Sequence, residues 1–228
     1  VIGIIITFVT VKYLAKKKQL PLSKKDFDDL LLYGIIGVIA GARLGSVVSE
    51  FNFYSSNPLQ IFAVWNGGLA FHGGLVGLII AGYYYSKKKK ISFYNVADLI
   101  VIPAAVALAL GRIANFINGE FFGTPTSLPW GVKFQNVEGF RHPVQLYESL
   151  KNFFIFAVLG TIKGQSLPPG ALFWSFVTLY GGIRFVLEFY KDLPPLLFNL
   201  TWGQVWSLPM FVIGVFVLFK LLQLRRKS

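Results

Sequence analysis

Six long apolar runs, separated by short polar segments, dominate the chain and cover residues 28–49, 67–86, 94–116, 146–163, 170–190 and 201–222. A helix needs about 20 mostly apolar residues to cross roughly 30 Å of hydrocarbon, and each run is about that long. A further apolar stretch, residues 1–15, is too short to cross alone. We expect it to be the inner end of a span whose start is missing, because the chain has no initiator methionine and Met210 is its only Met. The pattern predicts an all-α, polytopic membrane helix bundle: a single transmembrane domain, residues 1–228, with about seven transmembrane helices, the first one truncated.

The composition agrees with this pattern, because 54% of the residues are hydrophobic, 14% are charged and the mean hydropathy is +0.60. Soluble domains are about 25% charged. The formal net charge is +12, but the positive residues gather at the ends of apolar runs, in residues 16–18, 87–90 and 225–227. Such clusters are typical of the cytoplasmic loops of membrane proteins. We therefore predict the lipid bilayer as a partner and no nucleic acid.

The alternation of sides gives a predicted orientation. The lysine-rich segments 16–27 and 87–92 lie in the cytoplasm, and so does the basic C-terminus. The opposite loops, residues 50–66, 117–145 and 191–200, contain few basic residues, as the positive-inside rule requires of outer loops. We expect segment 117–145 to form a small extracytoplasmic cap between two transmembrane helices.

Two local patterns add detail. Residues 58–66 combine apolar and aromatic positions and predict a short amphipathic helix in the membrane interface. Glycines recur at a spacing of four residues in two of the apolar runs, at Gly37, Gly41 and Gly45 and at Gly73 and Gly77. Small residues at this spacing favour close packing between membrane helices.

Polar residues interrupt the outer halves of the predicted helices in four segments, residues 65–74, 111–123, 141–148 and 180–188. Arg112 alone costs about 2.5–3.5 kcal/mol at a bilayer centre on insertion scales, so another group must compensate for it. Tyr180, Arg184 and Glu188 have a spacing of four residues and share one helix face. Four polar segments at one depth predict a functional site on the extracytoplasmic side.

The residues also limit the chemistry of this site. The chain has no cysteine, which excludes a disulfide framework, a thiolate zinc site and a covalent cysteine nucleophile. No metal-ligating pattern is present in the sequence, and we expect neither a metal nor another cofactor.

Residues 111–123 read Gly-Arg-Ile-Ala-Asn-Phe-Ile-Asn-Gly-Glu-Phe-Phe-Gly. This run closely resembles the signature of the prolipoprotein diacylglyceryl transferases, multi-pass enzymes of the bacterial cytoplasmic (inner) membrane. The other three polar segments resemble the motifs of the same family in the same order, so the resemblance covers nearly the whole chain.

The resemblance implies a reaction and its partners. Such an enzyme takes the diacylglyceryl group from phosphatidylglycerol and transfers it to the thiol of the lipobox cysteine in a prolipoprotein signal peptide. A thioether forms and glycerol-1-phosphate leaves, which is the first step of bacterial lipoprotein maturation.

The resemblance also suggests which residues act. We expect Arg112 and Arg184 to clamp the phosphate, because guanidinium groups in a low dielectric stabilise the charge of the leaving group. His72 would deprotonate or orient the thiol, whose ordinary pKa is near 8.5. The expected substrate-binding residues are Asn115, Asn118, Glu120, Gly123, Tyr180, Glu188, Arg43, His142, Tyr147 and Glu148. One cavity in the outer half of the membrane, open sideways to lipid, is expected to be lined by His72, Arg112, Asn115, Glu120, Tyr180, Arg184 and Glu188.

Several of these residues also have a structural interpretation. Arg184 and Glu188 would form an ion pair between helices, and Glu120 would neutralise Arg112. His142 would be a turn residue, Tyr147 would belong to an aromatic belt, and Arg43 would extend its charge to the interface. Asp98 lies away from the other polar residues, and we expect it to be structural. Lys191 stands where many family members have arginine, and it lacks the bidentate fork of that residue.

A transporter or anion channel is the competing functional class. Broken, glycine-rich helices would then bring arginines to a site at the midplane. This alternative predicts internal repeats between the two halves of the chain, and none is evident in the sequence.

Overall fold

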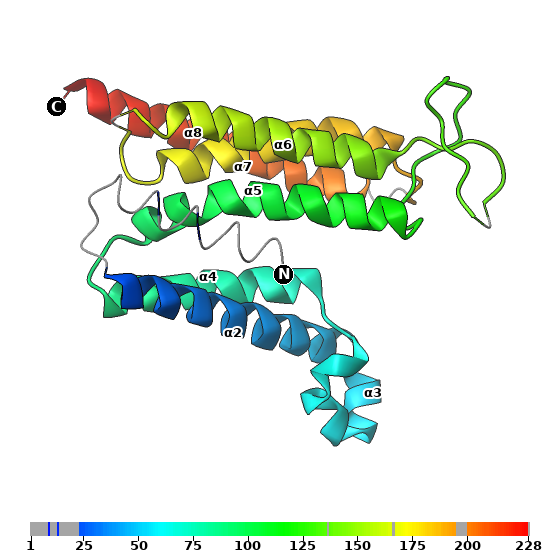
Figure 1. Cartoon of the computed structure of the whole chain (residues 1–228), viewed down its shortest axis with the longest axis horizontal. Coiled ribbons are helices and arrows are strands. Elements are labelled where there is room, and N and C mark those ends of the chain that lie inside the picture. The colour runs from blue at the N-terminus through cyan, green and yellow to red at the C-terminus, as the bar shows by residue number, and fades with distance from the viewer. Residues whose placement is uncertain are drawn as a thin grey trace. The chain divides into compact units, whose positions relative to one another are not determined.

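The computed structural model describes residues 23–135, 137–165, 167–194 and 200–227, together with Val9 and Tyr13. The rest of the predicted span 1–15 and the lysine cluster 16–18 lie outside the described residues. The described part is helical (Figure 1), with seven α-helices: α2 (Lys24–Ser49), α3 (Phe51–Ser56), α4 (Phe71–Lys88), α5 (Phe93–Ile117), α6 (Val144–Ile162), α7 (Ala171–Leu187) and α8 (Trp202–Lys227).

Six of these helices coincide with the six apolar runs, which confirms the helical prediction for each of them. The segments long and apolar enough to cross a membrane are Lys25–Ser49, Phe93–Ile117, Ala171–Tyr190 and Trp202–Gln223. Helix α3 has only six residues, too few to cross a bilayer. The structure therefore supports a membrane helix bundle with four candidate spans among the described residues. The expected total of about seven transmembrane helices stays a prediction.

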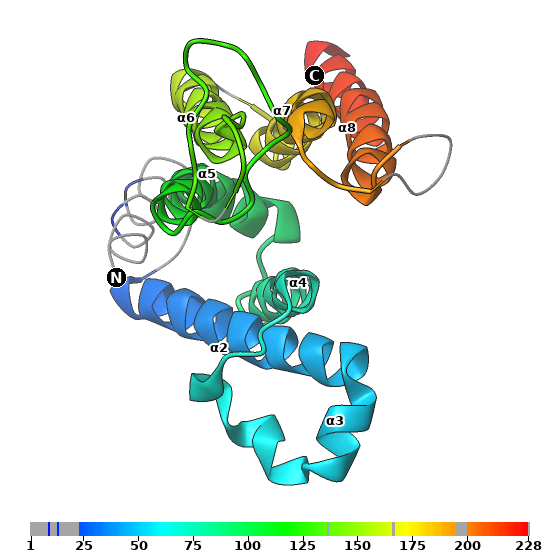
Figure 2. The same cartoon turned by 90° about the vertical axis from the view of Figure 1, so that its right-hand side faces the viewer.

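The described residues divide into two compact units, one within residues 11–97 and one that begins at residue 98. In the unit 11–97, α2 and α4 lie side by side (Figures 1 and 2). The predicted glycine contacts are confirmed, because a Cβ atom added to Gly41 would lie 2.3 Å from the carbonyl oxygen of Gly73. One added to Gly37 would lie 2.6 Å from the carbonyl oxygen of Gly77. The absence of side chains thus lets the two helix backbones touch.

Charged side chains join the start of α2 to the end of α4. Ser23 and Asp26 form a capping box at the N-terminus of α2, which satisfies backbone N–H groups that a helix leaves unpaired. Lys89 forms an ion pair with Asp26 and lies 3.5 Å from the carboxylate of Asp29. The hydrogen bond to Asp26 raises the pKa of the Lys89 ammonium.

The segment between α3 and α4 folds around the guanidinium of Arg43. It forms two 3₁₀ turns, Pro58–Phe62 and Val64–Asn66, and the single amphipathic helix predicted here is therefore wrong in type. Apolar side chains of these turns are exposed, with Leu59 at 84% and Trp65 at 79%. A hydrophobic surface of this kind suits a membrane interface.

In the unit that begins at residue 98, α7 packs on both α6 and α8 (Figure 2). A Cβ atom added to Gly214 would lie 2.5 Å from Thr178 Oγ1, so α7 and α8 also meet at a glycine. The buried carboxylate of Asp98 accepts hydrogen bonds from the backbone N–H groups of Gly170 and Phe173. Asp98 thereby caps the start of α7, which agrees with the structural role expected for it.

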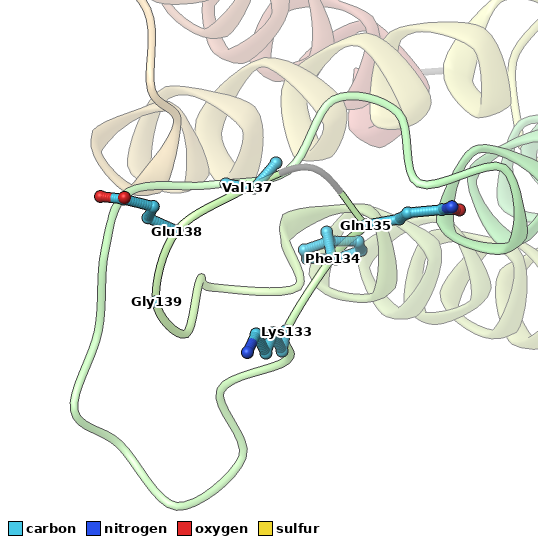
Figure 3. A pocket seen from close by; sticks show the side chains of 6 residues that line it. All are labelled: Lys133, Phe134, Gln135, Val137, Glu138 and Gly139. Carbon is cyan, nitrogen blue, oxygen red and sulfur yellow. The ribbon is translucent and has the colours of Figure 1, made fainter.

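The polypeptide between α5 and α6 is irregular and carries isolated β-bridges, two of them to Arg141 from Pro125 and Val132. A third bridge joins Gly123 to Lys191, beyond α7. Figure 3 shows a surface hollow in this segment, lined by Lys133, Phe134, Gln135, Val137, Glu138 and Gly139. None of the candidate catalytic residues lines this hollow, and the side of the membrane on which the segment lies stays a prediction.

Candidate active site

One face of α6 carries an unusual set of buried polar side chains. Gln145, Glu148 and Asn152 are each 1% exposed, and Lys151 is 4% exposed. Their spacing of three and four residues places them on the same side of the helix. Buried charges are costly unless other groups compensate for them, so this face identifies the centre of the candidate site.

Glu148 lies between two cations. Its Oε2 is 2.5 Å from Arg112 Nε at the end of α5, and its Oε1 is 2.6 Å from Lys191 Nζ after α7. The Glu148 side chain is 1% exposed, and that of Arg112 is 25% exposed. Three segments far apart in the sequence therefore meet at one carboxylate.

Glu188 extends this network. Lys191 Nζ lies 2.9 Å from Glu188 Oε2, and the Thr201 hydroxyl donates a 3.2 Å hydrogen bond to Glu188 Oε1. Arg184 Nε is 4.0 Å from Glu188, so the expected Arg184–Glu188 pair is present but long. A Cβ atom added to Gly203 would lie 1.9 Å from Glu188 Oε1, so a larger residue here would require the Glu188 carboxylate to move.

Tyr180 holds two further cations. Arg184 Nη1 donates a 3.0 Å hydrogen bond to the Tyr180 hydroxyl. Lys151 Nζ lies 3.8 Å from the centre of the Tyr180 ring, and Arg184 Cζ lies 5.9 Å from it. A cation over an aromatic face is stabilised by the ring quadrupole. The face shared by Tyr180 and Arg184 on α7 is thus directed to the polar face of α6.

Glu120 does not form the ion pair that neutralises Arg112, and Glu148 occupies that place. Asn115 stands between them: its Oδ1 is 3.5 Å from Arg112 Nη1, and its Nδ2 donates a 3.0 Å hydrogen bond to Glu120 Oε2. Gln145 donates a 2.6 Å hydrogen bond to the carbonyl oxygen of Glu120. Glu120 itself is exposed, so its carboxylate is the outer end of the network.

His142 and Tyr147 form an aromatic cluster with Trp130 and Tyr190. The Tyr147 hydroxyl accepts a 2.8 Å hydrogen bond from Trp130 Nε1 and lies 3.1 Å from His142 Nδ1. The rings of His142 and Tyr190 are 5.1 Å apart and tilted edge to face. This cluster fixes the start of α6 against the irregular segment before it, which gives both residues a structural role.

Two other expected substrate-binding residues, Asn118 and Gly123, come before this cluster in the sequence. Gly123 is packed tightly, because an added Cβ atom would lie 2.4 Å from the carbonyl oxygen of Tyr190. Its N–H donates to the carbonyl oxygen of His142, so Gly123 holds two backbone segments together. Asn118 is exposed just after the end of α5.

The remaining two predicted site residues belong to the unit 11–97. His72 is exposed in the first turn of α4, and its assignment to the reacting thiol stays a prediction. Arg43 is buried, and its guanidinium donates to the Tyr54 hydroxyl. It also donates to five backbone carbonyl oxygens, those of Gln60, Ile61, Ala63, Gly67 and Gly68. All five N–H donors of the arginine are thus used, and the two on Nη1 are shared among three acceptors. Arg43 thus shapes the turns, and its assignment to substrate binding stays a prediction.

Sequence reasoning missed Lys151 as a site residue. Its signal was an ionisable side chain inside a predicted span, three residues after Glu148. Lys191 was noted only as a variant of arginine, yet it bridges Glu148 and Glu188.

The cluster contains four cations, Arg112, Lys151, Arg184 and Lys191, and two carboxylates, Glu148 and Glu188. It therefore has a formal excess of two positive charges. Such an arrangement is suited to an anion, above all a phosphate that gains charge in a reaction. No group of three or more metal-ligating side chains occurs among the residues that the structure describes.

Comparison with known proteins assigns this chain to a family. The family model described as prolipoprotein diacylglyceryl transferase matches residues 1–220. A phosphatidylglycerol–prolipoprotein diacylglyceryl transferase of Geobacter sulfurreducens is 41% identical over 94% of this chain and 85% of its own length. Proteins with the same name from Bordetella avium and Cupriavidus metallidurans are 40% and 42% identical, over 91% and 83% of this chain and 81% and 73% of their own lengths. The chain therefore belongs to the prolipoprotein diacylglyceryl transferase family.

Proposed function

We propose that this protein transfers the diacylglyceryl group of phosphatidylglycerol to the lipobox cysteine of bacterial prolipoproteins. Membership of the family carries this proposal, since the relatives are named for that transfer. The cation-rich cluster around Glu148 supports it, because a lipid phosphate is the anionic group of the proposed donor. Membership also favours a transferase over a transporter.

The proposed step is a displacement at carbon. The cysteine sulfur forms a bond to the phosphate-bearing carbon of the diacylated glycerol. The bond between that carbon and the phosphate oxygen breaks. The phosphate oxygen keeps the electron pair and leaves as glycerol-1-phosphate. The thiol proton goes to a base, which we assign to His72. The products are a thioether and a phosphate monoester with more negative charge than the phosphodiester.

Arg112 and Arg184 are the proposed phosphate ligands. Each has a side chain about one-quarter exposed, and each is held at a fixed position, Arg112 by Glu148 and Arg184 by Tyr180. Guanidinium groups oriented in advance stabilise the leaving charge without reorganising during the reaction. Asn115 and Tyr180 would add neutral hydrogen bonds to the lipid headgroup. Glu148 and Glu188 would act by holding the cations.

We place the reaction on the extracytoplasmic side of the bacterial inner membrane, with the C-terminus in the cytoplasm. The distribution of basic residues supports this orientation. Modification of a single cysteine introduced at Lys88, by an impermeant reagent added to intact cells, would refute it.

The function is tested with purified protein from the full-length gene, phosphatidylglycerol labelled in its acyl chains and a lipobox peptide. The proposal expects label on the peptide and stoichiometric release of glycerol-1-phosphate. A peptide with serine in place of the lipobox cysteine is the control and should remain unlabelled. Equal labelling of both peptides, or no labelling of either, would contradict the proposed reaction.

A further inference from the structure

Lys151 differs from the other cations of the cluster. Arg112 and Lys191 lie against carboxylates, and Arg184 donates to a hydroxyl. Lys151 Nζ is buried and has no hydrogen-bond acceptor among the described residues. The Nζ atom lies over the face of the Tyr180 ring, 3.8 Å from the ring centre.

This position is unfavourable for an ammonium group that serves packing alone. Removing a charge from water is costly unless a counter-charge or several hydrogen-bond acceptors replace the water. A cation–π contact contributes about 0.5–2 kcal/mol, well below the cost of several kcal/mol for an unpaired buried ion. An apolar side chain would pack against Tyr180 without this cost. The ammonium is therefore explained best by a ligand that completes its contacts.

The surroundings of Lys151 indicate the chemistry of that ligand. Glu148 precedes it by one helical turn, but Arg112 and Lys191 already occupy both carboxylate oxygens. Arg184 shares the Tyr180 side chain with Lys151. Lys151 therefore belongs to a cluster with a formal excess of two positive charges, and this excess favours an anion.

We propose that Lys151 binds the phosphate of the anionic lipid donor, as a third cationic ligand besides Arg112 and Arg184. This inference rests on the proposed function, and it assigns to Lys151 a specificity for anionic headgroups. The donor phosphodiester carries one negative charge, and the released monoester approaches two. An ammonium has three donors on a flexible stem and follows the oxygens as their charge grows. Lys151 thus stabilises the leaving group more than the bound substrate, which is the requirement for catalysis.

The test uses the full-length protein and the variants Lys151→Met and Lys151→Arg, with Lys220→Met as the matched control. Lys220 lies in α8 with its Nζ 4.4 Å from the Phe216 ring, so it also makes a cation–π contact but lies outside the cluster. Four quantities are measured: the KM for phosphatidylglycerol, kcat, the inhibition constant of glycerol-1-phosphate, and the melting temperature. Binding of glycerol-1-phosphate is measured separately by calorimetry.

We expect Lys151→Met to raise the KM and the inhibition constant by about 10- to 100-fold, as for the loss of one charged hydrogen bond. Its kcat should fall as well, and its melting temperature should equal or exceed that of the wild type, because an unpaired buried charge is removed. Lys151→Arg should recover most of the lost affinity, and Lys220→Met should behave as the wild type.

Three results would overturn the proposal: unchanged kinetic constants in Lys151→Met, a lower melting temperature in that variant, or no recovery in Lys151→Arg. Failure of the proposed function gives a different result, since the wild type would then label no peptide. Calorimetry still decides the role of Lys151 in that case. Weaker binding of glycerol-1-phosphate by Lys151→Met supports an anion site, and equal binding refutes it.

Discussion

Glu148 allows the structural and catalytic roles of Arg112 to be separated. The perturbation is a pair of variants, Glu148→Leu alone and Glu148→Leu together with Arg112→Leu. The single change removes the carboxylate 2.5 Å from Arg112 and leaves that arginine without its ion-pair partner. The double change removes both charges. Lys191 keeps Glu188, 2.9 Å away, in either case.

The magnitude follows from burial. Breaking a buried ion pair by removing one partner costs about 3–5 kcal/mol, and the quarter exposure of Arg112 favours the lower end. We therefore expect Glu148→Leu to lower the free energy of unfolding by about 3 kcal/mol, which lowers the melting temperature of a chain of this size by about 6–12 °C. Replacement of a buried pair by apolar residues is often neutral, so the double variant should recover most of this loss.

The assay combines thermal unfolding in detergent with transfer of labelled lipid at matched protein levels. We expect stability to return in the double variant while transfer remains lost, because Arg112 is a proposed phosphate ligand. An active double variant would show that Arg112 serves only to pair with Glu148. A single variant as stable as the wild type would show that the ion pair contributes nothing to the fold.

Three further substitutions test other parts of the structure. Gly203→Ala should displace the Glu188 carboxylate, because the new Cβ atom would lie 1.9 Å from Oε1. Transfer should fall, and the free energy of unfolding should decrease by about 1–3 kcal/mol. Unchanged transfer would contradict this contact. Asp98→Ala should leave two backbone N–H groups at the start of α7 without an acceptor and lower the free energy of unfolding by about 1–3 kcal/mol, measured by thermal unfolding. Gly41→Val should cost about 1–3 kcal/mol, because its Cβ atom would meet the Gly73 carbonyl oxygen at 2.3 Å; a variant as stable as the wild type in the same measurement would argue against close packing of α2 and α4.

The hydrophobic pattern was sufficient to predict six of the seven α-helices of the described residues, and it missed the short helix α3. Apolar runs of about 20 residues have few structural solutions in a membrane, because every backbone polar group must be paired inside the segment. The glycine spacing in α2 and α4 likewise indicated close helix packing, since small side chains at that interval allow backbones to touch, but it did not identify which helices meet.

Pairings between segments could not be predicted in the same way. The sequence suggested Glu120 as the partner of Arg112, but the partner in the structure is Glu148, because the pairing depends on how α6 is rotated against the end of α5. The contacts of Arg43 could not be predicted from the sequence either. Most of its acceptors are backbone carbonyl oxygens, and every residue carries one. Lys151 could have been found from its place within an apolar run, but its position over Tyr180 required the packing of α6 on α7.

The central claim is that arginines of the cluster around Glu148 bind the lipid phosphate during transfer. The most direct measurement is the transfer rate of Arg112→Lys, assayed with labelled phosphatidylglycerol and a lipobox peptide at matched protein levels. A lysine keeps the charge but loses the planar fork, so we expect a folded protein whose rate falls by about 10²–10³-fold, as for loss of one donor to a developing negative charge. A rate close to that of the wild type would show that Arg112 supplies only charge, and it would contradict the proposed phosphate clamp.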